Sequence, residues 1–310
     1  MAYMRRLLPL LLSLRVRWGP DPLIRCEDFA ELFAGEQSVT NGLRCFGFEG
    51  IPMDQKYGCD LLSAVGFAAA VVAILKIRCG GILWAAPPCS SWVWISRGST
   101  GRTKDNVLGN VEYTSVRMSN RLVSRVAHLV WLAVRRKVFV IIEQPMDSLL
   151  WEHPRMKKLL LRYGLRDVRL ELGAYGALTP KPLILKTNVP WGEELRKTLT
   201  PEDRCKLKDL CERADVQVCK RRKDENGKVR TSGGRDLKAT QAYPLGFGAT
   251  IGKCHRRFCD SEEGKVVAAS KVPEDIWTVP GMEEDDSDLE DEFWVQEGDE
   301  CLDDVLLKVT

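Results

Sequence analysis

A cysteine and a glutamate stand at the ends of two apolar segments, where reactive side chains can be held in fixed directions. One segment leads into Pro87-Pro88 and then Cys89, and the other leads into Glu143. A proline pair fixes φ twice and removes two backbone donors, so it ends a strand and orients the next residue. A thiol can act as a nucleophile and a carboxyl group as a general acid or base. The pair therefore indicates covalent catalysis; the alternative for Cys89 is a buried, inert thiol.

Two further positions at expected strand ends suit a ligand. In ELFAGEQS, residues 31–38, a strand runs into a turn at Gly35 before a helix, and such a turn lets a ligand approach the backbone closely. About 20 residues later, Asp54 closes the next short strand, where a carboxylate can accept both hydroxyl groups of a ribose. A solvated turn residue is the alternative interpretation of Asp54.

The elements that must position these residues alternate between strand and helix. Strands are expected at residues 28–33, 50–54, 81–86, 138–142, 166–172 and 182–185. Helices are expected at 38–46 and 64–77, between Met118 and Ala133, and between Met156 and Tyr163. This alternation predicts an α/β fold with a doubly wound, parallel, Rossmann-like sheet. In open sheets of this kind, ligands bind at the carboxyl ends of the strands.

Three motifs in this order, ELFAGEQS, APPCSS and IIEQP, resemble the nucleotide-binding, catalytic and acid motifs of cytosine-5 methyltransferases. These enzymes use S-adenosyl-L-methionine (AdoMet) and act on DNA and, in one branch, on tRNA. The similarity covers roughly residues 28–185, with a weaker echo at 241–252. Amino-methylating relatives have a polar residue before the two prolines and an aromatic one after them. Here Ala86 and Cys89 hold those places, which favours methylation at carbon 5.

The resemblance implies AdoMet as cofactor and nucleic acid as partner, DNA more than RNA. It implies that Cys89 adds to carbon 6 of a cytosine, while Glu143 binds ring nitrogen 3 and the amino group. It assigns Phe33 and Gly35 to the cofactor turn. The other implied cofactor contacts are Asp54 with the ribose, Asp60 with the adenine and Pro87 as the wall beside it. The candidate substrate-binding residues are Ser90, Arg97 and Lys181.

Departures from the family pattern leave other interpretations open. Residues 36–38 stand where the family has further glycines, and Gln144-Pro145 stand where it has asparagine and valine. Arginines that normally follow a Tyr-Gly pair are missing, with only Lys181 nearby. The alternative is a catalytically degenerate nucleic-acid-binding or regulatory protein on the same fold. A third reading is a DNA-modification enzyme of another reaction type.

The net charge of +3 conceals an asymmetry. Residues 282–304 contain 13 acidic and no basic side chains, whereas residues 1–281 contain 45 basic and 30 acidic ones, an excess of 15. A basic body predicts a polyanionic partner; the alternative is a solubilising acidic tail on an ordinary basic domain. Residues 196–238 contain 14 basic and 8 acidic side chains, including KRRK at 220–223. The resemblance places a small target-recognition region there.

Four segments are expected along the chain. Residues 1–25 form a leader with a targeting role or an incidental one, and residues 26–190 form the AdoMet-binding catalytic core. Residues 191–260 form the basic region and the end of the core, and residues 261–310 a disordered acidic tail. The loop 96–110, which carries Arg97, is expected to be either a lid that closes on a phosphate backbone or a plain surface loop.

Cysteine usage and hydropathy limit the compartment and the partners. Eleven cysteines without regular spacing favour a reducing environment over a disulfide framework. We therefore expect an intracellular protein of the nucleus or an organelle. The longest apolar run, residues 64–75, is too short to span a bilayer, so no membrane is expected. The cysteines and the histidine between residues 205 and 259 lack paired metal-ligand spacing, so no metal is predicted.

Overall fold

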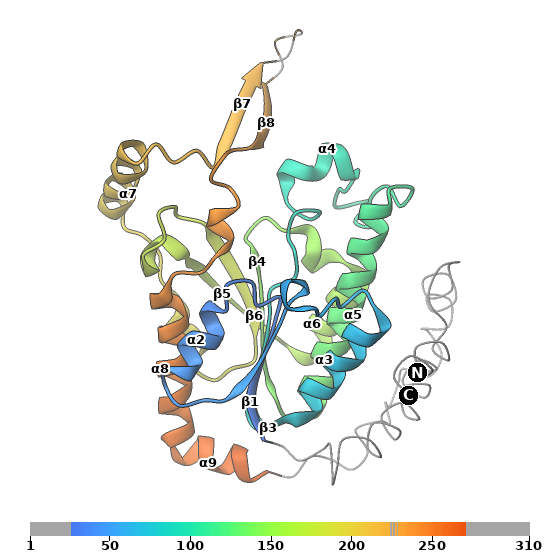
Figure 1. The fold of residues 1–310 in the computed structure, drawn as a ribbon, viewed down its shortest axis with the longest axis vertical. Coiled ribbons are helices and arrows are strands. Elements are labelled where there is room, and N and C mark those ends of the chain that lie inside the picture. The colour runs from blue at the N-terminus through green and yellow to red at the C-terminus, as the bar shows by residue number, and fades with distance from the viewer. Residues whose placement is uncertain (1–25, 224, 226, 228, 271–310) are drawn as a thin grey trace.

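A computed structural model describes residues 26–270 except 224, 226 and 228. Its centre is a six-stranded mixed sheet with helices on both faces (Figure 1). The strands lie in the order β2-β1-β3-β4-β6-β5. Their bounds are β1 Glu27–Leu32, β2 Gly50–Met53, β3 Ile77–Ala85, β4 Phe139–Pro145, β5 Arg166–Glu171 and β6 Pro182–Thr187. The predicted strands are all present, with ends shifted by a few residues, and the α/β class is confirmed.

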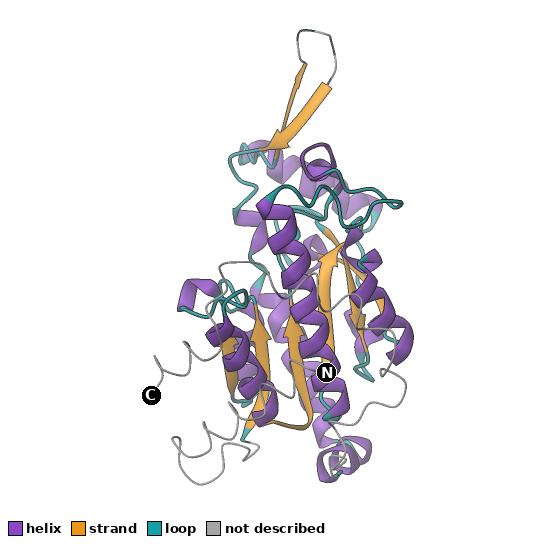
Figure 2. Cartoon of the chain, turned by 90° about the vertical axis from the view of Figure 1, so that its right-hand side faces the viewer, coloured by secondary structure: helices purple, strands orange, loops and turns teal. Residues whose placement is uncertain are grey.

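Two groups of helices bury the two faces of the sheet. On one face lie α3 Ala64–Lys76, α5 Thr114–Arg135 and α6 Pro154–Tyr163, and on the other lie α2 Ser38–Arg44 and α8 Leu245–Asp260 (Figures 1 and 2). Successive strand residues point to opposite faces. Leu83 of β3 therefore packs into the first core and Trp84 into the second, and both side chains are fully buried. Burial on both faces explains why the central strands are continuously apolar.

The prediction of a parallel sheet is wrong for one strand. The pairs β1–β2, β1–β3 and β3–β4 are parallel, but β6 runs antiparallel to both β4 and β5. Only residues 172–181 join β5 to β6, and they contain a single 3-10 turn, Leu172–Tyr175. A parallel return needs a dozen or more residues, usually with a helix, so this short connection makes the strand run back antiparallel.

The helices α2 and α8 cross at very short distance, although they lie far apart in the sequence. A Cβ atom added to Gly42 would stand 2.1 Å from the carbonyl carbon of Gly248, and one added to Gly252 would stand 2.5 Å from the Gly42 oxygen. The crossing therefore requires glycine at these positions. Because α8 covers the same face of the sheet as α2, the last part of the predicted basic region completes the core.

The rest of the basic region extends away from the sheet. Helix α7, Pro201–Arg213, is followed by a two-stranded antiparallel hairpin, β7 Cys219–Lys223 and β8 Val229–Gly233. Figures 1 and 2 show the hairpin projecting beyond the carboxyl edge of the main sheet. Every residue of β7 is exposed.

Both ends of the chain lie largely outside the described residues. These include the leader at 1–25 and residues 271–310 of the acidic tail, so the targeting role and the disordered tail stay predictions. The sequence places the start of the tail at residue 261, but the structure has helix α9, Glu262–Ala269, next to α8 and β3. Within the described part of the chain, no helix has the length and apolar character needed to cross a membrane.

Candidate active site

A cavity of about 850 Å³ opens at the carboxyl ends of β1, β3 and β4. The strand order reverses there, since β1 lies between β2 and β3, and such a reversal point is where open α/β sheets bind ligands. The cavity collects all of the predicted site residues but one. Those lining it are Phe33, Gly35, Asp54, Asp60, Pro87, Cys89, Ser90, Glu143 and Lys181.

The turn after β1 is tied to the turn after β2 by a carboxylate. Phe33 and Gly35 have φ values of 62° and 49°, in the left-handed region. The backbone N–H of Gly35 donates to Oδ2 of Asp54 at 3.0 Å, and the N–H of Lys56 donates to Oδ1 at 2.8 Å. Each oxygen of Asp54 thus accepts one backbone hydrogen bond and retains a lone pair for a ligand hydroxyl group. Asp54 therefore holds the two turns together and is also a candidate for binding a ligand.

A second carboxyl group of β1, Glu31, is fully buried below this turn. Its Oε2 accepts from the backbone N–H of Thr40 at 2.7 Å and from Oγ1 of Thr40 at 2.5 Å. Burial raises the pKa of Glu31 to about 7, although the two hydrogen bonds oppose that shift. Sequence reasoning missed this residue. Its signal was a charged side chain within an apolar strand, which requires a partner.

The proline pair that carries Cys89 is held from the neighbouring strand. Nε2 of Gln144 donates to the Pro87 carbonyl at 2.5 Å, and Oε1 of Gln144 accepts from the Ser148 hydroxyl at 2.9 Å. The Cys89 side chain is partly exposed at the cavity wall. Burial, and secondly the charge of Glu143, raise the pKa of the Cys89 thiol, while Lys181 lowers it. At rest this thiol is therefore protonated.

Glu143 is only 6% exposed, and a tyrosine from another part of the chain binds it. The hydroxyl of Tyr243 donates to Oε2 of Glu143 at 2.7 Å. Burial raises the pKa of Glu143, whereas Lys181 and the Tyr243 hydrogen bond lower it. Tyr243 lies in the segment that weakly echoes the resembled family. Sequence reasoning found that segment but did not identify this residue.

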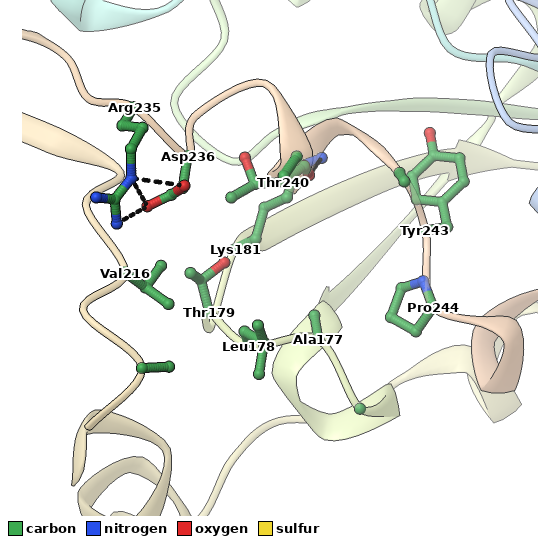
Figure 3. A pocket seen from close by; sticks show the side chains of 14 residues that line it. Ala177, Leu178, Thr179, Lys181, Val216, Arg235, Asp236, Thr240, Tyr243 and Pro244 are labelled. Atoms are coloured by element: carbon green, nitrogen blue, oxygen red, sulfur yellow. Dashed lines mark hydrogen bonds and ion pairs between the residues drawn. The ribbon is translucent and has the colours of Figure 1, made fainter. Parts of the chain in front are cut away.

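Lys181 lies between the main cavity and a second pocket of about 320 Å³. Its Nζ donates to the Thr240 carbonyl at 2.7 Å and stands 5.6 Å from the centre of the Tyr243 ring. Figure 3 shows Lys181 extending across the smaller pocket toward Thr240, with Tyr243 at the edge of the pocket. Lys181 thus lies where it can lower the pKa of both Cys89 and Glu143.

Arg97 is the predicted site residue that does not line the cavity. It is exposed on the short helix α4, Arg97–Thr100. The arginine that matters in this loop is Arg102, which is fully buried. Its guanidinium lies 3.5 Å from the Trp92 ring centre and donates to Ser91 Oγ and to the Val107 carbonyl. Arg102 therefore anchors the loop 96–110, which favours the surface-loop interpretation over a freely moving lid.

The described residues were compared with two further kinds of site, a metal-ligand cluster and a disulfide. Residues 26–270, apart from the three omitted, contain no group of three or more His, Cys, Asp or Glu side chains able to hold a metal ion. Their cysteines are free thiols.

Comparisons of the chain with protein-family models and with curated proteins find no match. The site's own geometry therefore carries the functional argument.

Proposed function

We propose that this protein is an AdoMet-dependent methyltransferase that transfers a methyl group to carbon 5 of cytosine in DNA, or in RNA, through a covalent adduct with Cys89. One observation carries the proposal. A thiol and a carboxyl group from the ends of adjacent strands line the same cavity as the Gly35 turn and Asp54. A nucleophile, an acid and a nucleoside-binding turn are the parts that this reaction needs.

The residues at the β1–β2 end of the cavity fit the proposed cofactor. The Gly35 turn leaves room for a ligand, since a Cβ atom there would have no neighbour closer than 4.0 Å. Asp54 retains lone pairs for two ribose hydroxyls, and Asp60 presents a carboxylate that already accepts from Leu62 N–H through Oδ1. Phe33 and Pro87 supply apolar walls. When bound, AdoMet supplies an electrophilic methyl group.

Cys89 and Glu143 then divide the chemistry between them. The Cys89 thiol gives its proton to solvent and its sulfur adds to carbon 6; the C5–C6 double bond opens, and the proton of Glu143 passes to ring nitrogen 3. Carbon 5 is now electron-rich and would take the methyl group that the cofactor supplies, while the methyl–sulfur bond breaks and its electron pair stays on the departing sulfur as a thioether. Its hydrogen is then lost as a proton to a base, the carbon–sulfur bond breaks, and the thiolate leaves as the double bond returns. Ring nitrogen 3 gives its proton back to Glu143.

The exposed hairpin supports a nucleic-acid partner. Lys220, Arg221, Arg222 and Lys223 are consecutive residues of β7, so cations stand on both faces of a thin ribbon. The ribbon projects beyond the carboxyl ends of the main strands (Figure 1), which is the edge of the sheet where the residues that line the cavity lie. Basic side chains in such a position suit contacts with a phosphate backbone while the target base is turned out of its stack.

A cytosine fluorinated at carbon 5 tests the proposal. Fluorine cannot leave as the hydrogen does, so the adduct cannot eliminate and is trapped. Intact-mass measurement after incubation with AdoMet and fluorinated DNA or RNA should show protein plus oligonucleotide, and Cys89→Ser should show none. Adduct that persists in Cys89→Ser would place the nucleophile elsewhere. No adduct on either nucleic acid, in protein that binds AdoMet, would refute the reaction.

One contact favours the alternative of a binding protein without turnover. Lys56 pairs with Glu36 at 2.8 Å, across the turn where the resembled family has glycine. This pair could hold the turn closed against a cofactor. Calorimetry separates the two functions, because the enzyme should bind AdoMet and Asp54→Ala should weaken that binding. Folded wild-type protein that binds nucleic acid but no AdoMet would support the alternative.

A further inference from the structure

We propose that Tyr243 is a positioning residue that keeps the proton of Glu143 on Oε1, and so makes this carboxyl group recognise the ring edge of cytosine rather than uracil. The inference rests on the proposed function, because it assigns a role within the same site. It concerns a residue from the segment before α8, 100 positions away from Glu143 in the sequence.

The side chain of Tyr243 is fixed from several sides. Its ring packs edge-on against Trp84, with ring centres 5.7 Å apart, and at a tilt against Phe247, with ring centres 5.4 Å apart. Its carbonyl accepts a hydrogen bond from the hydroxyl of Ser38 at 2.9 Å. Figure 3 shows its hydroxyl pointing away from Pro244 and out of the smaller pocket. The hydroxyl is thus held on Oε2 of Glu143 by packing, and the 2.7 Å bond is not a chance contact of a mobile side chain.

The hydrogen bond determines which oxygen of Glu143 carries the proton. In a protonated carboxyl group, the carbonyl oxygen is a better acceptor than the hydroxyl oxygen. Because Tyr243 donates to Oε2, that oxygen keeps carbonyl character and the proton resides on Oε1. Among the described residues, no group donates a hydrogen bond to Oε1, and Glu143 lines the cavity. Oε1 is therefore available to the base.

This arrangement matches one pyrimidine and not the other. Cytosine presents an acceptor at ring nitrogen 3 and a donor at the amino group, so Oε1–H donates to the first and Oε2 accepts from the second. Uracil presents a donor at nitrogen 3 and an acceptor at the neighbouring carbonyl, so both contacts fail. Sites that lose hydrogen-bond partners in this way reject the wrong ligand strongly, since buried polar groups are left unpaired.

Two groups act on the protonation of Glu143 in the cavity. Lys181, just before β6, and the Tyr243 hydroxyl, before α8, stabilise the charged form. The Cys89 thiol, after β3, stands near enough for Glu143 to raise its pKa. Removing only the Tyr243 hydroxyl should therefore raise the pKa of Glu143 and leave Lys181 in place. Tyr243→Phe makes this change and keeps the ring that packs on Trp84.

Carboxyl-carbon NMR titration of the whole chain with labelled glutamate tests this without any activity. The resonance missing from Glu143→Gln assigns the signal. Tyr243→Phe should move its midpoint to higher pH. Tyr175→Phe is a matched control, because its hydroxyl donates to the Leu195 carbonyl and its ring also packs on Phe247; it should leave the midpoint unchanged. An unchanged midpoint in Tyr243→Phe would overturn the inference.

Exchange of the hydrogen at carbon 5 with water gives a second readout that needs no cofactor. Reversible addition of Cys89, with protonation of nitrogen 3 and of carbon 5 by solvent, exchanges that hydrogen. Tyr243→Phe should lower the exchange rate by about tenfold or more, shift its pH profile to higher pH and reduce the preference for cytosine over uracil oligonucleotides, with little change in KM. Exchange by the wild type with an unaltered profile in the variant would contradict the role of Tyr243. Absence of exchange in the wild type would count against the proposed function, and the NMR midpoint would still decide the inference.

Discussion

The cavity and the β7–β8 hairpin carry charge in opposite ways. In the cavity region, Glu31 and Glu143 are buried and burial raises the pKa of both. Glu31 accepts hydrogen bonds from Thr40 in the following helix, and Glu143 accepts one from Tyr243, 100 positions further along the chain. On the hairpin, charges such as Arg221 and Arg222 are exposed neighbours in sequence. Buried charge responds to protons and to packing, whereas exposed charge responds to salt. The difference separates the part to which we assign the proposed chemistry from the part to which we assign partner binding.

Replacing Glu143 should have the largest effect on the proposed chemistry. Glu143→Gln keeps the shape of the side chain and removes the carboxyl group that can donate and accept a proton. We expect adduct formation with fluorinated cytosine to slow by about 10²-fold or more, the usual effect of losing a positioned acid–base group. Binding to nucleic acid should change little, because we assign it to the hairpin. Intact mass followed over time measures the rate. Equal rates of adduct formation in variant and wild type would show that Glu143 has no role in this step.

Glu31 should make the stability of the cavity region depend on pH. The pKa of Glu31 is raised from 4.5 to about 7 in the folded chain, so between these values the folded state holds a proton that the unfolded state has lost. The contribution of Glu31 to the free energy of unfolding is therefore greatest below pH 4.5 and falls as pH rises toward 7. By that point it has fallen by up to about 3 kcal/mol. Glu31→Gln should remove this dependence.

Urea denaturation at pH 5 and pH 8 measures the effect. The variant should gain stability relative to the wild type at the higher pH. Tyr175→Phe serves as a control for loss of a buried polar group elsewhere in the core. A constant difference between variant and wild type at the two pH values would mean that Glu31 does not titrate in this range.

Packing at the glycine crossing can be broken directly. Gly42→Ala places a Cβ atom 2.1 Å from the backbone of Gly248, so α2 and α8 must separate. We expect a loss of about 1–3 kcal/mol in the free energy of unfolding, the range for overpacked cores. Gly98→Ala is the control, since a Cβ atom there would meet nothing within 4 Å. An unfolding free energy equal to that of wild type would show that the crossing tolerates displacement.

The hairpin should respond to salt and not to these changes. Arg221→Gln with Arg222→Gln removes two exposed charges. If both contact phosphates, the magnitude of the slope of log affinity against log salt concentration should fall by about 1.8. Over a roughly fourfold range of salt, the variant should therefore lose about tenfold more affinity at the low-salt end than at the high-salt end. Lys253→Gln with Lys265→Gln removes two exposed charges from α8 and α9 and should leave the slope nearly unchanged. Equal slopes in the two double variants would show that these hairpin residues do not contact the phosphates of the nucleic acid.

Local sequence patterns predicted much of the fold and of the cavity. Apolar runs and turn residues predicted the strands, and the motifs at their ends predicted Cys89, Glu143 and Asp54 as neighbours of one cavity. That succeeded because parallel strands bring their carboxyl ends to one edge. The direction of β6 was not predicted, since strand patterns carry no direction; the signal for it is the short connection, residues 172–181.

The residues that support the site were harder to predict. Tyr243, Gln144 and Arg102 act through contacts with groups distant in the sequence, and none has a distinctive local pattern. The sequence favours Arg97 because it follows the candidate nucleophile Cys89 in a basic loop. The loop instead folds around Arg102, whose stacking on Trp92 and bonds to backbone oxygens stabilise it in the interior. A charged residue's burial depends on partners that composition does not reveal.

The glycine crossing between α2 and α8 also sets an order of events during synthesis. The Ser38–Tyr243 bond beside it joins residues 205 positions apart, and α8 ends at Asp260. Until that helix has left the ribosome, α2 lacks its cover and Glu143 lacks the Tyr243 hydroxyl. We therefore expect the nascent chain to hold its thiol and carboxyl group in an unfinished site until residue 260 has been added and α8 can fold. The site would be completed only when the last core helix docks.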